Sequence, residues 1–110
     1  MDKQQRLEKI ISGCQEGSEQ AFADLVDMYA SRCYGYFYRL CGNSTVSNDL
    51  LSDLFTKLFM KFNTFKGGSF EKWLFTIASN IFHDYLRHRY RQKKLMDGKV
   101  RGRIIVDVNQ

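Results

Sequence analysis

Apolar side chains recur every three or four residues through most of this 110-residue chain, which contains no proline. A period of about 3.6 residues places such side chains on one face of an α-helix, whereas a half-buried strand alternates at every second residue. Proline would break a helix in its interior, so its absence leaves each of these segments intact. The spacing therefore predicts an all-α fold.

The apolar faces predict one short helix and three longer ones. The short helix comes first and ends at the glycine-containing break GCQEGS. Ser18 is placed to cap the second helix, which we expect to run to about Cys41. The connector GNSTVSN precedes the third helix, and the last helix is expected from about Phe70 to near Lys94.

The length of the chain leaves room for one domain with a single core. At 44% hydrophobic and 26% charged residues, the composition is that of a globular domain. We expect residues 1–94 to form a compact bundle of three main helices plus a short N-terminal helix. Residues 95–110 are expected to be a linker or flexible tail.

Several classes of protein are disfavoured by composition. No apolar run approaches the roughly 20 residues of a membrane span, and the N-terminus lacks the apolar stretch of a secretory signal. We therefore expect a cytoplasmic protein that does not bind membranes. Cys14, Cys33 and Cys41 are odd in number and lack CxxC spacing, which predicts reduced thiols and no metal site.

Charge is distributed unevenly along the chain. Residues 1–86 carry 9 basic and 10 acidic side chains, whereas residues 87–110 carry 8 and 2. The body is thus nearly neutral, and the basic stretch RHRYRQKK begins the C-terminal part. Such a stretch could hold a polyanion, although charge alone is equally compatible with a solvated tail.

The third predicted helix has an unusual outward face. Asp49, Asp53, Thr56 and Met60 cluster opposite its apolar face. Solvation explains the carboxylates but gives no reason for an exposed methionine. A surface that binds a partner is therefore an alternative to a simply solvated face.

The outward face of the last helix combines hydrogen-bond donors, cations and an aromatic ring. Its members are Lys72, Trp73, Thr76, Asn80, His83, Arg87, Arg89 and Arg91. Trp73 could stack on a nucleic-acid base, since such stacking contributes about 1–3 kcal/mol per base. The alternatives are that its indole lies over the preceding loop and that the polar set is an ordinary solvated surface.

The loop before this helix, NTFKGGSF, contains two adjacent glycines. Without Cβ atoms, Gly67 and Gly68 permit a close approach of a ligand and leave their amide groups accessible. Ser69 is placed to cap the helix that follows. The loop alone is weak evidence for a binding site, but it lies beside the polar face.

No arrangement of residues predicts catalysis. His83 and Asp84 are adjacent on a helix and point about 100° apart, so they do not form a base and its orienting partner. His83 and His88 lack a third metal ligand, and no phosphate-binding glycine motif is present. We expect no enzymatic activity and no cofactor.

Three blocks of this sequence resemble a known family. They are AFADLVDMY, then NDLLSDLF, then FKGGSFEKWLFTIASNIFHDYLR. Over roughly residues 18–91 they are similar to region 2 of extracytoplasmic-function (ECF) sigma factors of the sigma-70 family. The long, ordered third block makes a chance agreement improbable.

The resemblance implies two binding surfaces and their residues. It implies that the helix of the second block binds the clamp helices of the largest subunit of core RNA polymerase, through Asp49, Leu50, Asp53, Thr56 and Met60. It implies that residues 65–69 hold a flipped non-template base of the promoter minus-ten element. The expected DNA-binding residues are Phe65, Lys66, Gly67, Gly68, Ser69, Phe70, Lys72, Trp73, Thr76, Asn80, His83, Arg87, Arg89 and Arg91.

The sequence departs from the family pattern in two places. Asn48 stands where a second acid is common, and Ser52 stands where glutamine is common, so the polymerase-binding face is less acidic than usual. Nothing after Lys94 predicts the helix-turn-helix domain that reads the minus-thirty-five element in this family.

These observations predict a transcription initiation module that binds core polymerase and melts the minus-ten element by capturing single-stranded promoter DNA. An anti-sigma factor is a possible further partner. The alternative is a sigma-like adaptor or decoy, which would bind polymerase or an anti-sigma factor without opening DNA.

Overall fold

The computed structural model describes the backbone of residues 1–101 and the side chains of residues 1–96. Its elements are α1 (Lys3–Gln15), α2 (Glu19–Cys41), α3 (Ser44–Lys61), the short 3₁₀ helix η1 (Phe62–Thr64) and α4 (Phe70–Arg101). No strand occurs among the described residues, and the predicted all-α fold is confirmed.

Local hydrogen bonds and one glycine set the ends of α2 and the start of α3. The hydroxyl of Ser18 accepts a bond from the backbone N–H of Ala21 at 3.1 Å, which confirms its predicted capping role. Gly42 ends α2 with a φ of 66°, a left-handed conformation that glycine adopts without strain. The side chain of Asn43 then caps α3 by accepting from the N–H of Val46 at 2.8 Å.

The predicted connector GNSTVSN was too long. Helix α3 begins at Ser44, so residues 44–48 belong to it. Serine and asparagine favour turns because their side chains compete for backbone groups. Here the fully buried Ser47 instead donates its hydroxyl to the carbonyl of Asn43 at 2.7 Å, one turn earlier in the same helix. A bond within the helix therefore replaces the expected turn.

The last helix is longer than its apolar face predicted. It continues to Arg101 rather than ending near Lys94. The identification of residues 95–110 as a linker stays a prediction, and residues 102–110 lie outside the described part of the chain.

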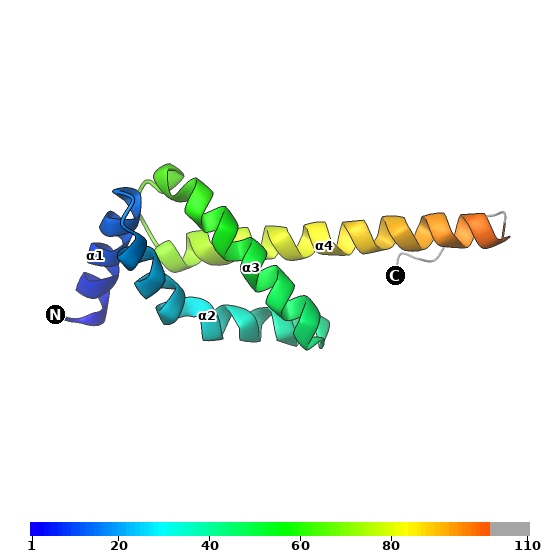
Figure 1. Ribbon diagram of the computed structural model, residues 1–110, viewed down its shortest axis with the longest axis horizontal. Coiled ribbons are helices and arrows are strands. Elements are labelled where there is room, and N and C mark those ends of the chain that lie inside the picture. The colour runs from blue at the N-terminus through cyan, green and yellow to red at the C-terminus, as the bar shows by residue number, and fades with distance from the viewer. Residues whose placement is uncertain (102–110) are drawn as a thin grey trace.

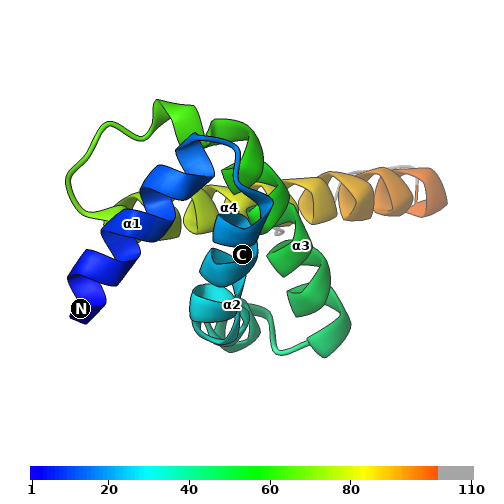
Figure 2. The ribbon, with the colours of Figure 1, turned by 60° about the vertical axis from the view of Figure 1, so that its left-hand side comes forward.

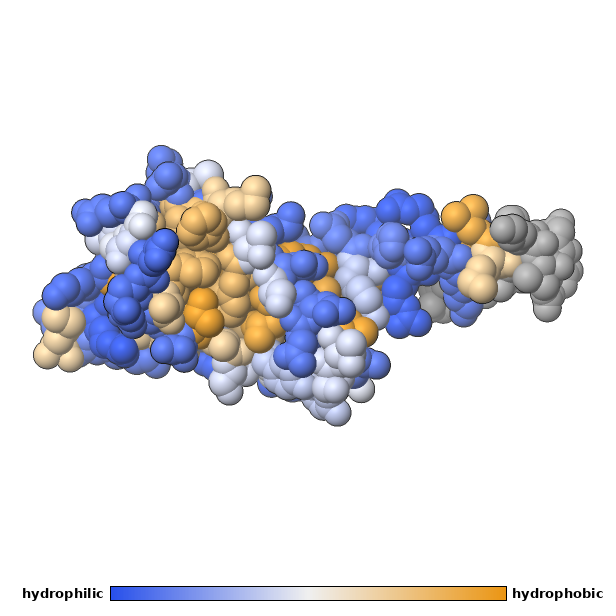
Figure 3. Space-filling view, viewed as in Figure 1, coloured by the Kyte–Doolittle hydropathy of each residue, from blue (hydrophilic) through white to orange (hydrophobic). Residues whose placement is uncertain are grey.

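Helices α2, α3 and α4 surround one core, and α1 covers the end from which the loop between α3 and α4 emerges. Figure 1 shows α3 crossing α4, while the second half of α4 extends beyond the bundle. Figure 2 shows α1 next to that loop. Figure 3 shows apolar side chains on the bundle and hydrophilic ones along the extending part of α4.

The core consists mainly of the predicted apolar faces. Its fully buried large side chains include Leu25, Tyr29, Phe37, Leu54, Leu58 and Leu74. Leu40 follows the apolar period of α2 but is 48% exposed, whereas Phe82 is buried. No helix within the described residues combines the length and apolarity needed to cross a membrane.

Candidate functional site

The loop between η1 and α4 turns through its two glycines. Gly67 has a φ of 106° and Gly68 a φ of 84°, conformations that side chains with a Cβ rarely adopt. Apart from the glycine itself and its two neighbours in the chain, no residue has a heavy atom within 4 Å of the position that a Cβ would occupy on Gly67 or Gly68. Ser69 then caps α4, as predicted, by accepting a bond from the N–H of Lys72 at 3.2 Å. The glycines therefore serve the turn and face open space.

A hollow of about 610 Å³ lies between this loop and α1. The loop side and the start of α4 contribute Phe65, Gly67, Gly68, Ser69, Phe70 and Glu71, and α1 contributes Gln4, Leu7, Glu8, Ile11 and Ser12. Sequence reasoning predicted the loop side but missed α1 entirely. The sequence shows α1 only as an apolar period, and no signal in it places this helix beside a loop some fifty residues later.

The C-terminal end of α1 is tied directly to the loop. The side-chain amide of Gln15 donates to the carbonyl of Phe62 at 3.2 Å and to that of Phe65 at 3.1 Å. Both amide hydrogens are thus used to hold the backbone where α3 gives way to the loop. This contact fixes one wall of the hollow relative to the other.

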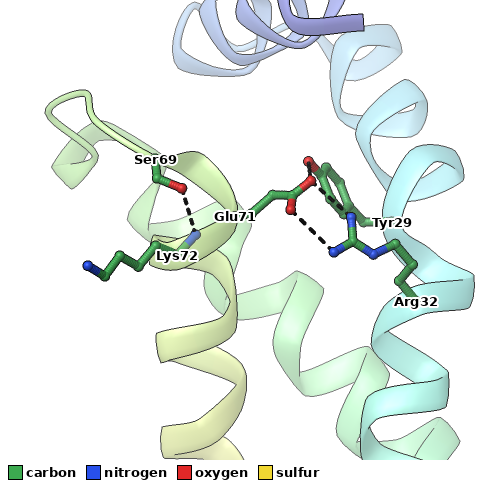
Figure 4. A network of polar contacts seen from close by, with 5 residues as sticks. All are labelled: Tyr29, Arg32, Ser69, Glu71 and Lys72. Carbon is green, nitrogen blue, oxygen red and sulfur yellow. Dashed lines mark hydrogen bonds and ion pairs between the residues drawn. The ribbon is translucent and has the colours of Figure 1, made fainter.

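A second polar contact holds the start of α4 against α2. In Figure 4 the carboxylate of Glu71 faces Arg32 and Tyr29. Arg32 donates to its two oxygens at 2.9 and 3.2 Å, and the hydroxyl of Tyr29 donates at 3.0 Å. Hydrogen bonds from Arg32 and then from Tyr29 hold the pKa of Glu71 below its usual value. Burial, followed by the bond to Glu71, raises the pKa of Tyr29.

Trp73 lies against the loop rather than projecting freely. Its ring centroid is 5.1 Å from that of Phe65, 5.8 Å from that of Phe62 and 5.7 Å from that of Phe70. The indole is half-buried, as expected from the alternative in which it covers the preceding loop. Phe70 is only 3% exposed and packs in the core, although it borders the hollow between the loop and α1.

The other predicted DNA-binding side chains of α4 are exposed. Asn80, His83 and Arg87 line a hollow of about 450 Å³ together with Lys57 and Lys61 of α3. These two lysines were missed by sequence reasoning, because only the crossing of the helices brings them beside α4. Together with Arg87 they give this surface, here called the basic hollow, a positive charge.

The residues expected to bind polymerase lie on the other side of the crossing. Asp49, Asp53, Thr56 and Met60 are exposed, and Met60 is 74% exposed. Leu50 is only 4% exposed and packs in the core, although it also borders the hollow that these residues line, so its predicted role stays a prediction.

These exposed residues share a hollow of about 560 Å³ with side chains of α4. Asp84, Tyr85 and His88 line it from that side, and no sequence signal had assigned them there. Asp84 is also paired with Arg87. With carboxylates from both helices, this surface is here called the acidic hollow.

The chain is similar to proteins of a known family. The sequence profile of the family described as Sigma-70 region 2 matches residues 25–92. The ECF RNA polymerase sigma factor SigW of Bacillus subtilis is 30% identical over 97 residues, which cover 87% of this chain and 51% of that protein. SigE of Mycolicibacterium smegmatis is 38% identical over 68 residues, 62% of this chain and 26% of that protein.

A third ECF sigma factor, BldN of Streptomyces coelicolor, is 32% identical over 84 residues, 74% of this chain and 32% of that protein. The chain thus spans about half or less of the length of these three relatives. The family match covers more than half of the chain and includes α3, the loop and most of the described part of α4. The chain therefore belongs to the sigma-70 family, as region 2 of the ECF type.

Proposed function

We propose that this chain acts in transcription initiation by binding core RNA polymerase and capturing single-stranded promoter DNA. Two surfaces of opposite charge support the proposal. The basic hollow offers Lys57, Lys61 and Arg87 to a polyanion, and the acidic hollow offers carboxylates and Met60 to a protein. The relatives are named RNA polymerase sigma factors.

The observation that carries the DNA part is the hollow behind the diglycine loop. Its volume of about 610 Å³ is ample for one nucleobase, and the glycines leave their side of it open. Extruding a base from a duplex costs a few kcal/mol. Stacking on Phe65, which lines the hollow and is packed against Trp73, and hydrogen bonds inside the hollow can together offset that cost.

The remaining polar residues would position the DNA backbone. Lys57, Lys61 and Arg87 surround the basic hollow, with Asn80 and His83 among them. Contacts to phosphate fix position, whereas contacts to base edges give specificity. A strand whose extruded base enters behind the loop could therefore continue along α4 toward Arg89 and Arg91, both of which are exposed.

For polymerase, we propose that the acidic hollow receives the clamp helices of the largest subunit. Asp49 and Asp53 would supply charge, and the exposed Met60 would supply an adaptable apolar contact.

The DNA part can be tested by selecting preferred single strands from a random oligonucleotide pool. Affinity of the selected strand is then measured by fluorescence anisotropy for the wild type, Trp73→Ala and Asn80→Ala. Loss of stacking should weaken binding by about tenfold for Trp73→Ala. Tyr38→Ala is the control, since Tyr38 is an exposed aromatic residue of α2 stacked on Tyr34. Binding should also weaken with salt, by a log–log slope of about −0.7 per neutralised phosphate.

An affinity that is indifferent to both Trp73→Ala and a scrambled oligonucleotide would remove base capture. The adaptor alternative gives a different pattern. An adaptor would bind a polymerase clamp fragment, and lose that binding when Asp49 and Asp53 become asparagine, yet prefer no oligonucleotide sequence.

A further inference from the structure

The wall of the loop hollow that faces the glycines belongs to α1. Gln4, Glu8 and Ser12 lie on one side of that helix at spacings of four residues, and all three line the hollow. The family profile begins to match at residue 25, so the match does not include this wall.

The hydrogen bonds already made within the hollow show which of its polar groups can still bind a ligand. The side-chain amide of Gln4 donates to the Glu8 carboxylate at 3.2 Å, which leaves acceptor positions on both oxygens. Among the described residues no cation lies within ion-pair distance of Glu8. Glu71, the other carboxylate of the hollow, is already engaged by Arg32 and Tyr29.

Glu8 is thus the exposed carboxylate of this hollow whose remaining acceptor positions a ligand can use in place of water. A carboxylate in such a site accepts N–H groups and repels carbonyl oxygens. Adenine, cytosine and guanine each carry an exocyclic amino group that can donate to it. Thymine offers a single ring N–H between two carbonyl oxygens, which the carboxylate would repel.

We propose that Glu8, oriented by Gln4, selects the captured base in favour of one that carries an exocyclic amino group. The inference rests on the proposed capture of a base behind the loop. It assigns specificity to α1, whereas the loop supplies access and Phe65, packed against Trp73, supplies stacking. Gln4 acts as a positioning residue, because its amide holds the carboxylate that contacts the base.

The test uses oligonucleotides that differ by one functional group. Starting from the selected strand, each cytosine in turn is replaced by uracil, which exchanges the amino group for a carbonyl, and each adenine by unsubstituted purine, which lacks it. At the captured position the wild type should lose about tenfold in affinity. Glu8→Ala should lose this discrimination at that position and keep it elsewhere.

Glu8→Gln is a more specific test than Glu8→Ala, because it is expected to change which base is preferred. Its amide can donate to the O4 of uracil and accept from the ring N–H, so the preference should shift toward uracil. Glu16→Gln is the matched control, since it removes the same charge from an exposed residue that caps the C-terminus of α1 and does not line the hollow. Thermal unfolding of each variant shows whether the fold is kept.

The outcomes separate the two proposals. If the wild type prefers a sequence and Trp73→Ala weakens binding, but the Glu8 variants keep every base preference, the role of Glu8 is refuted and base capture stands. If no protein prefers any sequence and Trp73→Ala has no effect, base capture itself fails.

Discussion

The contact between α2 and α4 at Glu71 allows a quantitative prediction. Glu71→Ala removes the acceptor of the Tyr29 hydroxyl, which belongs to a side chain only 1% exposed. A buried hydroxyl left without a partner costs about 1–3 kcal/mol. The ion pair with Arg32 contributes less, about 0.2–1 kcal/mol, because its side chains are 51% and 42% exposed and water screens them.

The expected loss in the free energy of unfolding for Glu71→Ala is therefore about 2 kcal/mol, most of it from the stranded hydroxyl. For a domain of this size each kcal/mol lowers the melting temperature by roughly 4–8 °C. Tyr29→Phe alone should cost about 1 kcal/mol, because Glu71 keeps Arg32. In the Glu71→Ala background the same change should be neutral or stabilising, since it removes a hydroxyl that has no partner.

The assay is a double-mutant cycle by chemical denaturation, with a coupling of about 1–2 kcal/mol expected between the two residues. The reasoning is refuted if Tyr29→Phe costs the same with and without Glu71. Such a result would mean that water accepts the hydrogen bond of the Tyr29 hydroxyl in place of the carboxylate. The burial of Tyr29 would then not leave its hydroxyl without a partner.

The pH dependence gives an independent check on the same contact. Glu71 has a lower pKa in the folded protein than in the unfolded chain. Its stabilisation is therefore complete above the unfolded pKa and is lost as pH falls through the folded one. Between neutral pH and about pH 3 the wild type should lose more stability than Glu71→Gln.

Two further predictions concern the loop and the core. Gly68→Ala should lower stability by about 1–2 kcal/mol, measured by thermal unfolding, because its φ of 84° strains a side chain although no atom obstructs the Cβ; Gly68→Asn should cost less. Cys33 is fully buried, and burial raises its pKa to about 11, so iodoacetamide at about pH 8 should leave it unmodified in the native protein and label it after denaturation.

The elements of this fold could be predicted because their signals are local. An apolar period, a capping serine at Ser18 and another at Ser69 depend on residues within one helical turn, and all three are confirmed. The start of α3 was missed because Ser47 makes a bond inside the helix where serine more often makes a turn. Leu40 shows the limit of the apolar period, because it follows that period in α2 and is nevertheless 48% exposed.

For the candidate site, the sequence could predict only the residues that lie within one continuous stretch of the chain. Arg32 and Glu71 are 39 residues apart, and Gln15 lies 50 residues from the carbonyl of Phe65 that it binds. Such pairs produce no periodic pattern in the sequence, because each partner taken alone resembles a solvated surface residue. The position of Trp73 stayed open for the same reason, because its neighbours Phe62 and Phe65 precede it across the turn of the loop.

Helix α3 also explains why the two hollows differ in charge. Asp49, Asp53, Lys57 and Lys61 follow one another at intervals of four residues, so they form a single stripe whose sign reverses halfway. Lys57 lines both hollows, as do Ile81 and Asp84 of α4, which places the reversal at the crossing of the helices. Under the proposed function, a polymerase bound at the acidic end of this stripe would hold the same helix whose basic end is proposed to face the DNA. Recruitment and strand capture would then be coupled by one crossing of two helices, without any movement between domains.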